Sequence, residues 1–288
     1  MNEKHQQTSI SIKHQNILRF TEEQSAPMVD IVTQESPLEI NVTAGSGVNR
    51  KKETIAITMR TPGEDAHLAL GFLFSEGLIN TYDDILKIED PATTQGLGED
   101  QTVHLYLRPD VWLDKKSLER HFYTSSSCGV CGKVALDLVR QQIGYVLPEA
   151  HPKIRIKSLY HWPDQMRKDQ SVFSQTGSIH AAGLFSSQGQ LLACCEDVGR
   201  HNALDKLIGA ALKKQALPWS NNILLLSGRI SFELVQKALM AGVPIIAAVG
   251  APSSLAIDLA DAHGMTLVGF LKKNTCNVYC GAQRLLSD

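Results

Sequence analysis

The stretch Asn222-Ile223-Leu224-Leu225-Leu226-Ser227-Gly228-Arg229 marks the point where short apolar runs begin to alternate with helical patterns. Residues 223–226 are all apolar, which is typical of a strand covered on both faces of a sheet. The same pattern returns in Pro244-Ile245-Ile246-Ala247-Ala248-Val249 and again in Met265-Thr266-Leu267-Val268-Gly269-Phe270. We therefore predict three buried strands, of which residues 265–270 form the last.

Helical patterns separate these strands and also precede them. Helices are predicted from about residue 231 to 241 and from residue 253 or 254 to 263. Upstream, residues 178–185 and 190–195 flank a turn as a hairpin, and the segment after Gly199 has the apolar spacing of an amphipathic helix. This order predicts a layered α/β sheet with crossover helices.

The ends of the three strands predict a binding site. Open α/β sheets bind ligands beyond the carboxyl ends of their strands, which here are Ser227-Gly228-Arg229, residues 250–254 and residues 271–275. Helix N-termini attract anions, and Arg229 can contact a phosphate in bidentate fashion. Lys272 and Lys273 add two ammonium groups. This edge therefore suits a small phosphorylated ligand.

The first half of the chain predicts a smaller α+β unit. Residues 1–24 are polar and without periodicity, which indicates a flexible tail. Residues 38–43 and 54–59 alternate apolar and polar side chains as an antiparallel hairpin does, and residues 103–107 predict a further strand.

A buried helix is predicted between these strands. Thr61 is the expected N-cap, Pro62 suits the first helical position and Glu64 completes a capping box. Residues 66–74 are apolar on most sides, and Gly77 is expected to end the helix.

Two cysteines stand three apart in Ser125-Ser126-Ser127-Cys128-Gly129-Val130-Cys131-Gly132-Lys133. Serine and glycine predict a flexible loop, and an apolar-periodic run predicts a helix over residues 133–143. The N-terminus of that helix and Lys133 would favour the thiolate, which is the form that attacks another sulfur. A bare C-x-x-C also fits half of a zinc site, a thioredoxin-like redox pair or two inert thiols.

The overall amino-acid composition argues against a nucleic-acid-binding protein, a secreted disulfide scaffold and a membrane protein. The chain has 288 residues, 43% of them hydrophobic, and 28 basic against 30 acidic residues give a net charge of −2. This balance does not favour nucleic-acid binding. Six cysteines are too few for a secreted disulfide scaffold. Residues 1–24 carry no apolar core of signal-peptide length, and no apolar run reaches the 18 or so residues that a membrane span needs. We therefore expect a cytoplasmic protein with reduced thiols and no membrane partner.

The residues present argue against two kinds of zinc site, the catalytic site of a nucleotide deaminase and a structural site. Zinc nucleotide deaminases share this element order but need a glutamate two residues after the ligand and a later P-C-x-x-C. His180 and His201 lack that glutamate, and Ser227-Gly228-Arg229-Ile230 stands where the cysteine pair should be. Cys194-Cys195 and the pair Cys276 and Cys280 have awkward spacing for one tetrahedral site, so no structural metal is expected.

Several blocks together resemble one known family, the formate dehydrogenase accessory sulfurtransferases of the FdhD family. These blocks are residues 122–133, residues 176–182, residues 196–206, Ser227-Gly228-Arg229 and residues 266–270. They keep the family's order, and the resemblance extends from about residue 30 to the end of the chain.

The resemblance implies a function and a site. Members of this family move sulfur from a cysteine desulfurase onto the bis-molybdopterin guanine dinucleotide molybdenum cofactor before its insertion into formate dehydrogenase, and they act as homodimers. Cys128 matches the persulfide-bearing cysteine and Cys131 its companion. The segment that holds the guanine dinucleotide is matched by Phe270, Leu271, Lys272, Lys273, Asn274 and Thr275.

The resemblance also implies an architecture. Residues 25–160 are expected to form an α+β domain that ends in the CxxC loop and its helix. Residues 161–288 are expected to form a cytidine-deaminase-like three-layer domain without the zinc site. The chain as a whole is expected to be α/β, or α+β overall.

Three functions stay open at the level of sequence. A sulfurtransferase needs Cys128 to carry sulfur, with Cys131 either releasing it through a disulfide or supporting the persulfide. A non-catalytic cofactor chaperone needs the strand-end site but not Cys128. A thioredoxin-like reductase needs a reversible disulfide between the two cysteines and no nucleotide site.

Overall fold

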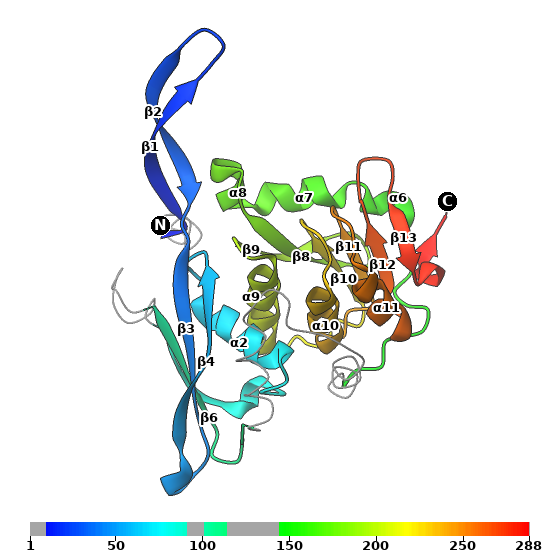
Figure 1. Ribbon diagram of the computed structural model, residues 1–288. Coiled ribbons are helices and arrows are strands. Elements are labelled where there is room, and N and C mark those ends of the chain that lie inside the picture. The colour runs from blue at the N-terminus through cyan, green and yellow to red at the C-terminus, as the bar shows by residue number, and fades with distance from the viewer. Residues whose placement is uncertain (1–9, 91–100, 114–143, 288) are drawn as a thin grey trace.

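The three wholly apolar runs form the centre of a six-stranded sheet in the computed structural model, which describes residues 10–90, 101–113 and 144–287 (Figure 1). The strand order is β13-β12-β11-β10-β8-β9. The bounds are β8 His180–Ser186, β9 Leu191–Asp197, β10 Asn222–Leu226, β11 Ile245–Ala248, β12 Thr266–Gly269 and β13 Asn277–Cys280. β10, β11 and β12 are mutually parallel, while β8, β9 and β13 each pair antiparallel to a neighbour.

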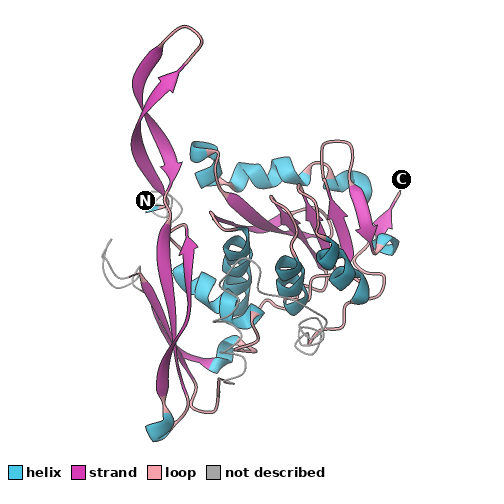
Figure 2. Ribbon diagram, viewed as in Figure 1, coloured by secondary structure: helices cyan, strands magenta, loops and turns pink. Residues whose placement is uncertain are grey.

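Alternate residues of the central strands enter two different cores. Ile223 and Leu225 pack in a core with Trp162 of α7, whose ring stacks on Phe185 at 4.6 Å between centroids. Leu224 lies in the other core, with α9, α10 and α11. The bounds are α6 Ile156–Leu159, α7 Trp162–Asp169, α8 Ser171–Thr176, α9 Arg200–Lys213, α10 Phe232–Met240 and α11 Ser254–Ala262. Helices thus cover both faces of the sheet, which explains why these strands are apolar throughout (Figure 2).

The predicted order of strands and helices over residues 178–270 is confirmed, with one correction. β12 is not the last strand, because β13 pairs antiparallel with it and extends the sheet at that edge. β13 is short and only partly buried, so its sequence lacks the apolar run that identifies the central strands.

A second sheet of four strands carries the first half of the chain, in the order β4-β3-β6-β5. The bounds are β3 Ser36–Ala44, β4 Lys51–Arg60, β5 Ile85–Glu89 and β6 Thr102–Leu107. The predicted hairpin is β3 with β4, and the predicted strand at 103–107 is β6, which runs parallel to β3. Leu38, Ile40 and Leu105 belong to the same continuous core as Leu224.

The helix predicted after this hairpin is α2, Asp65–Ser75, but its N-terminus differs from the prediction. Glu64 is the N-cap residue, in a left-handed conformation with φ 59°, and no side chain caps the helix. Thr61 instead accepts a hydrogen bond from Val198 N at 3.1 Å. The predicted capping box therefore does not form, because the Thr61 hydroxyl is used by a contact distant in sequence.

α2 joins the two halves by packing closely on α9. A Cβ atom on Gly71 would lie 1.8 Å from the Asp205 carbonyl oxygen, and one on Gly209 would lie 1.9 Å from the His67 carbonyl oxygen. Only glycine permits two helix backbones to approach this closely. This crossing places the four-stranded sheet against the helical layer of the six-stranded one (Figure 1).

The N-terminal segment corrects another prediction. β1, Ile12–Phe20, and β2, Ser25–Thr33, form an antiparallel ribbon that extends away from the body (Figure 1). The polar composition of residues 1–24 predicts a flexible tail, whereas residues 12–20 form a strand. In a ribbon exposed on both faces, backbone pairing holds the strands, so no apolar periodicity marks them.

Short elements complete the described chain. These are the 3-10 helices Gly47–Asn49, Tyr82–Asp84 and Ala282–Arg284 and the strands β7 Ile154–Arg155 and β14 Leu285–Leu286. β7 and β14 pair in parallel, and Ile154 and Leu159 pack in the same core as Trp162. The domain boundaries at residues 24 and 160 stay predictions.

Candidate functional site

Two of the predicted site residues fall outside the part of the chain that the structure describes. Cys128 and Cys131, with the loop and helix predicted around them, lie between the described residues 113 and 144. Their assignment therefore stays a prediction.

The segment predicted to hold a nucleotide follows β12 at the carboxyl edge of the six-stranded sheet. Phe270 has a φ of 51° and is 42% exposed, while Leu271 is buried. Leu271 N donates to Ala248 O at 3.0 Å, and Lys272 N donates to Thr275 O at 2.9 Å, which closes a turn. Leu271 thus anchors a turn whose remaining residues, Lys272, Lys273, Asn274 and Thr275, are all exposed.

Backbone contacts connect this segment to Arg229 across the edge of the sheet. Phe270 N donates to Gly250 O at 3.0 Å, and Gly250 N donates to Gly228 O at 3.1 Å. A Cβ atom on Gly250 would lie 2.7 Å from Arg229 N, so glycine is required there. The structure therefore brings together the three strand ends that the sequence analysis selected, with the exposed Arg229 among them.

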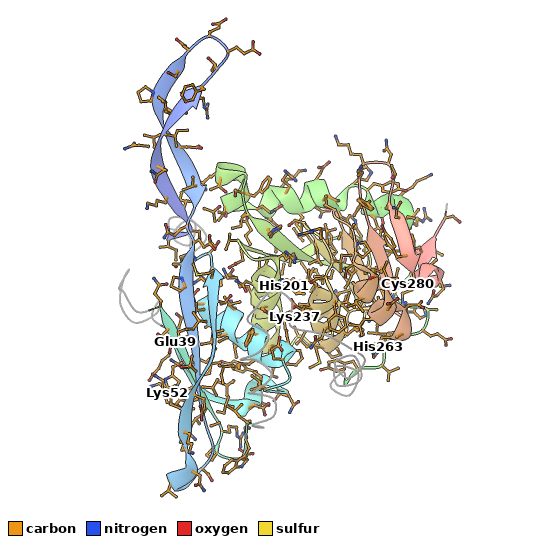
Figure 3. The ribbon with its side chains drawn as sticks, viewed as in Figure 1. Glu39, Lys52, His201, Lys237, His263 and Cys280 are labelled. Carbon is orange, nitrogen blue, oxygen red and sulfur yellow. The ribbon has the colours of Figure 1, made fainter. Side chains whose placement is uncertain are left out.

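Two histidines and an arginine that the sequence analysis did not assign to the site lie at the same edge. A Cβ atom on Gly228 would lie 3.1 Å from His180 Nδ1 and 3.8 Å from Arg200 Cδ. His201, which Figure 3 labels, follows Arg200 in α9. Its Nε2 contacts Ser231 Oγ at 2.8 Å. In the sequence, His180 and His201 stand out as failed zinc ligands and as members of two matching blocks, and Arg200 as a member of one such block, but none of the three is predicted as a site residue.

Burial and nearby cations keep both imidazoles neutral. Burial, then Arg200 and Arg229, lowers the pKa of His180. Burial, then Arg200 and Lys237, lowers the pKa of His201 to about 3. The lone carboxylate in ion-pair contact with His201 among the described residues is Glu233, 3.1 Å from its Nε2 and largely exposed, so solvent screens its effect.

The strand-end cations have no carboxylate partners within the described ranges. No ion pair there involves Arg200, Arg229, Lys272 or Lys273, and Arg200 Nε is buried with no hydrogen-bond acceptor. A buried donor without an acceptor costs free energy, so the arrangement favours an anionic ligand.

Three of the described cysteines, Cys195, Cys276 and Cys280, are poorly suited to nucleophilic attack. Burial is the largest cause of the raised pKa values of Cys195, Cys276 and Cys280, with the last at about 11. Cys280 also donates to Met265 O at 3.3 Å. Since thiolate is the reactive form, these thiols are structural rather than chemical.

A cavity of about 380 Å³ lies beside Cys195, between β9, α8, α9 and the loop before α2. Its wall includes Lys206, whose ammonium group pairs with Asp197 at 2.8 Å, and it takes residues such as Thr61 and His67 from the first half of the chain. Glu196 lines it and accepts hydrogen bonds from Val172 N and Phe173 N at the start of α8.

The described residues hold neither a metal-binding cluster nor a membrane-spanning helix. Among residues 10–90, 101–113 and 144–287, no group of three or more histidine, cysteine, aspartate or glutamate side chains is arranged to hold a metal ion. No helix in those ranges is both long and apolar enough to cross a membrane.

Comparison with known proteins decides the family. Residues 33–286 match the model of the FdhD/NarQ family. The chain belongs to the FdhD/NarQ family. The resemblance drawn from five sequence blocks is therefore confirmed.

Members with assigned names match this chain over nearly its full length. It is 45% identical to the sulfur carrier protein FdhD of Streptomyces avermitilis over 276 residues, which are 95% of each chain. It is 42% identical to the sulfur carrier protein FdhD of Mycobacterium tuberculosis, over 94% of this chain and 98% of the relative.

A solved structure shares the family fold. A candidate formate dehydrogenase accessory protein from Desulfotalea psychrophila superposes with a TM-score of 0.70 and 24% identity, over 96% of this chain and 99% of that one. The predicted mixed α/β class is therefore confirmed for the chain as a whole.

Proposed function

We propose that this FdhD/NarQ family member is a sulfur carrier that delivers sulfur to a molybdenum cofactor for formate dehydrogenase. The observation that carries the proposal is the 45% identity, over 95% of both chains, to a protein named as a sulfur carrier. Formate dehydrogenase as the client is supported by the name of the structural relative.

The chemistry is assigned to Cys128. Its thiolate attacks the outer sulfur of a persulfide on a cysteine desulfurase, so that a Cys128 persulfide forms and the donor leaves as a thiolate. The raised pKa values of Cys195, Cys276 and Cys280 support this assignment, because those thiols stay protonated at neutral pH.

Release of the outer sulfur as sulfide needs two electrons. Cys128 and Cys131 can supply them together, because the pair is oxidised to a disulfide. Attack of the Cys131 thiolate on the inner sulfur of the persulfide forms a Cys128–Cys131 disulfide and expels the outer sulfur as sulfide. The sulfide then becomes available to the metal of the substrate cofactor. Two equivalents of a cellular thiol restore the pair by successive disulfide exchange and leave as their own disulfide.

The substrate is bis-molybdopterin guanine dinucleotide, held by residues 270–275 and Arg229. Support comes from the exposed Lys272, Lys273 and Arg229, which have no ion-pair partner among the described residues and can meet phosphate charge. The exposed Phe270 offers an aromatic face for a guanine base.

The remaining expectations from the family resemblance belong to the same proposal. The protein acts as a cytoplasmic homodimer, and residues 161–288 form a deaminase-like domain without zinc. The hairpin β8–β9 followed by alternating helices and parallel strands supports this description of the domain.

Mass spectrometry of the Cys128 peptide tests the proposal. After incubation with a cysteine desulfurase and cysteine, the peptide should gain one sulfur atom, and Cys128→Ala should abolish transfer while guanine nucleotide binding persists. Cys276→Ala is the matched control and should leave the sulfur gain unchanged. No gain on Cys128 would favour a cofactor chaperone. Loss of two hydrogens that occurs without desulfurase and cysteine would favour a thioredoxin-like reductase, because in the proposed transfer the disulfide forms only after Cys128 has taken up sulfur.

A further inference from the structure

The ribbon of β1 and β2 carries apolar side chains on a face that no described part of the chain covers. Residues that pair directly across an antiparallel ribbon share a face, and the register pairs Asn16 with Val29, Leu18 with Pro27 and Phe20 with residue 25. On this face Leu18 and Val29 are each 55% exposed and Phe20 is 73% exposed. Adjoining exposed apolar side chains of this kind mark a surface for a partner.

The base of the same ribbon face does have a cover. Thr33 pairs with Ile12 on this face, and its hydroxyl donates to Ser178 O at 2.8 Å, just after α8. Beyond α8 the ribbon extends away from the body (Figure 1). A two-stranded ribbon by itself is at best marginally stable in water. The outer part of the ribbon therefore needs a second surface to pack on.

The four-stranded sheet offers such a surface on its outer face. Alternate residues of β3 point into the core on the α2 side, so their neighbours and the residues paired with those neighbours point to the other side. On this outer face Ile57 is 67% exposed and Met59 is 49% exposed. His104 and Tyr106 of β6 stack there with 4.2 Å between their ring centroids. The outer face is therefore partly apolar and aromatic.

The ribbon and the sheet match in length and in charge. β1, β2 and β3 each have nine residues, and β4 has ten. Glu22 and Glu23 lie in the turn at the tip of the ribbon, whereas Lys51 and Lys52 begin β4 at the far end of the sheet. All four side chains are exposed, and none of them forms an ion pair within the described ranges. The acidic end of one surface thus suits the basic end of the other.

These two ends cannot meet within one chain. β2 runs into β3 through residues 34 and 35 alone, so the ribbon tip and the β3–β4 turn lie at opposite ends of one long hairpin stack (Figure 1). A two-fold axis near residues 34 and 35 would lay the ribbon of each copy along the sheet of the other. Because the two arms are equally long, each acidic tip would then reach the other copy's Lys51 and Lys52.

Such an exchange buries enough surface for a stable dimer. A strand of nine residues spans about 30 Å and a pair of strands is about 10 Å wide, so one ribbon face covers about 300 Å². Two ribbon faces and the two sheet faces beneath them amount to about 1,200 Å², which reaches the range of specific protein–protein interfaces.

We propose that the ribbon of β1 and β2 docks on the outer face of the four-stranded sheet of a second copy of this chain. Its exposed apolar side chains pack on the apolar and aromatic side chains of that sheet, and its acidic tip pairs with Lys51 and Lys52. The inference rests on the proposed function for the number of copies, and it adds the surface through which they associate.

Sedimentation velocity of the full chain measures the contribution of the apolar face. The wild type should sediment as a dimer. Leu18→Asp combined with Phe20→Asp should weaken association about tenfold or more, because each carboxylate would lose its water on docking. Both positions are exposed in the single chain, so thermal unfolding of the variant should stay close to that of the wild type. Val146→Asp, at a position 98% exposed and outside the ribbon and the sheet, is the matched control and should associate as the wild type does.

A charge exchange between copies tests the register of the interface. One variant carries Glu22→Lys with Glu23→Lys, and the other carries Lys51→Glu with Lys52→Glu. Each variant alone should associate several-fold more weakly than the wild type, because like charges meet at both contacts. An equimolar mixture should recover association, because the ends of one variant then oppose the ends of the other. A role of the ribbon within its own chain would gain nothing from mixing.

The outcomes separate this inference from the proposed function. A dimer that Leu18→Asp with Phe20→Asp leaves intact would overturn the ribbon interface and leave the homodimer standing. A monomeric wild type would overturn it as well and assign the ribbon to a different protein. Mixing that restores no association would contradict the pairing of the charged ends. Ribbon-dependent dimers in which Cys128 takes up no sulfur would support the interface and count against the sulfur carrier.

Discussion

Single residues at the strand-end edge show how environment assigns chemical character. His201 differs from the exposed His14 of β1 because it is largely buried and lies among Arg200, Lys237 and His180. The cysteines follow the same logic, since burial leaves Cys195 and Cys280 as inert thiols. The residue type therefore sets which reactions a side chain can take part in. Burial and neighbouring charges then determine whether its reactive protonation state is present.

His201 predicts a loss of stability at mildly acidic pH. Its pKa is about 3 in the folded protein, against about 6.5 for an exposed histidine, so the unfolded state gains a proton first as pH falls. The stabilising contribution is present above pH ~6.5 and is lost progressively toward pH ~3, the interval between the two pKa values. Between pH 7 and pH 5 the free energy of unfolding should fall by on the order of 1 kcal/mol from this group.

Urea denaturation at several pH values measures this effect. His201→Gln should show a shallower loss of stability between pH 7 and pH 5 than the wild type, while His14→Gln should follow the wild-type curve. Parallel curves for His201→Gln and wild type would show that His201 does not titrate as expected.

At the scale of elements, the crossing of α2 and α9 is the contact that joins the two halves of the chain. Glycine in a helix interior ordinarily costs about 1 kcal/mol relative to alanine. Here Gly71 and Gly209 stand where each helix meets the other's backbone, with His67 and Asp205 as the opposing carbonyls. The loss in helix propensity is offset by the contact area that a close crossing allows.

Gly209→Ala should destabilise the protein by about 3 kcal/mol, because the new methyl group must displace backbone atoms rather than a flexible side chain. Thermal unfolding of the variant provides the measurement. Gly144→Ala, where no atom lies within 4 Å of the added Cβ, is the matched control and should change stability little. A Gly209→Ala variant as stable as the control would mean that the helices do not cross this closely.

At the scale of the whole molecule, a buried ion pair of the second half holds the first half through hydrogen bonds to Thr61. Lys206 of α9 contacts Asp197 of β9 at 2.8 Å and donates to Thr61 O, in the loop before α2, at 2.8 Å. Thr61 N in turn donates to Asp197 at 3.1 Å. The N-terminal sheet and the six-stranded sheet therefore share both a core and a polar junction.

Lys206→Met should cost about 3–5 kcal/mol, since it leaves the fully buried Asp197 without its counter-ion. Lys213→Met, an exposed change on the same helix, should have little effect. Chemical denaturation can compare the two variants, and adding Asp197→Asn to Lys206→Met should restore part of the loss. Equal stability of Lys206→Met and wild type would exclude a structural role for this junction.

The sequence by itself determined the local order of this protein and its family. Runs such as residues 223–226 and the glycines that end the helices act over a few residues, so periodicity and chain stereochemistry suffice to read them. The sequence alone likewise identifies the cysteine pair and the five matching blocks. Tertiary structure alone decided the ribbon of β1 and β2, the glycine crossing of α2 on α9, and the convergence of His180, Arg200 and Arg229. These features depend on contacts between residues distant in the chain, and such contacts leave no periodic signal in the segments that make them.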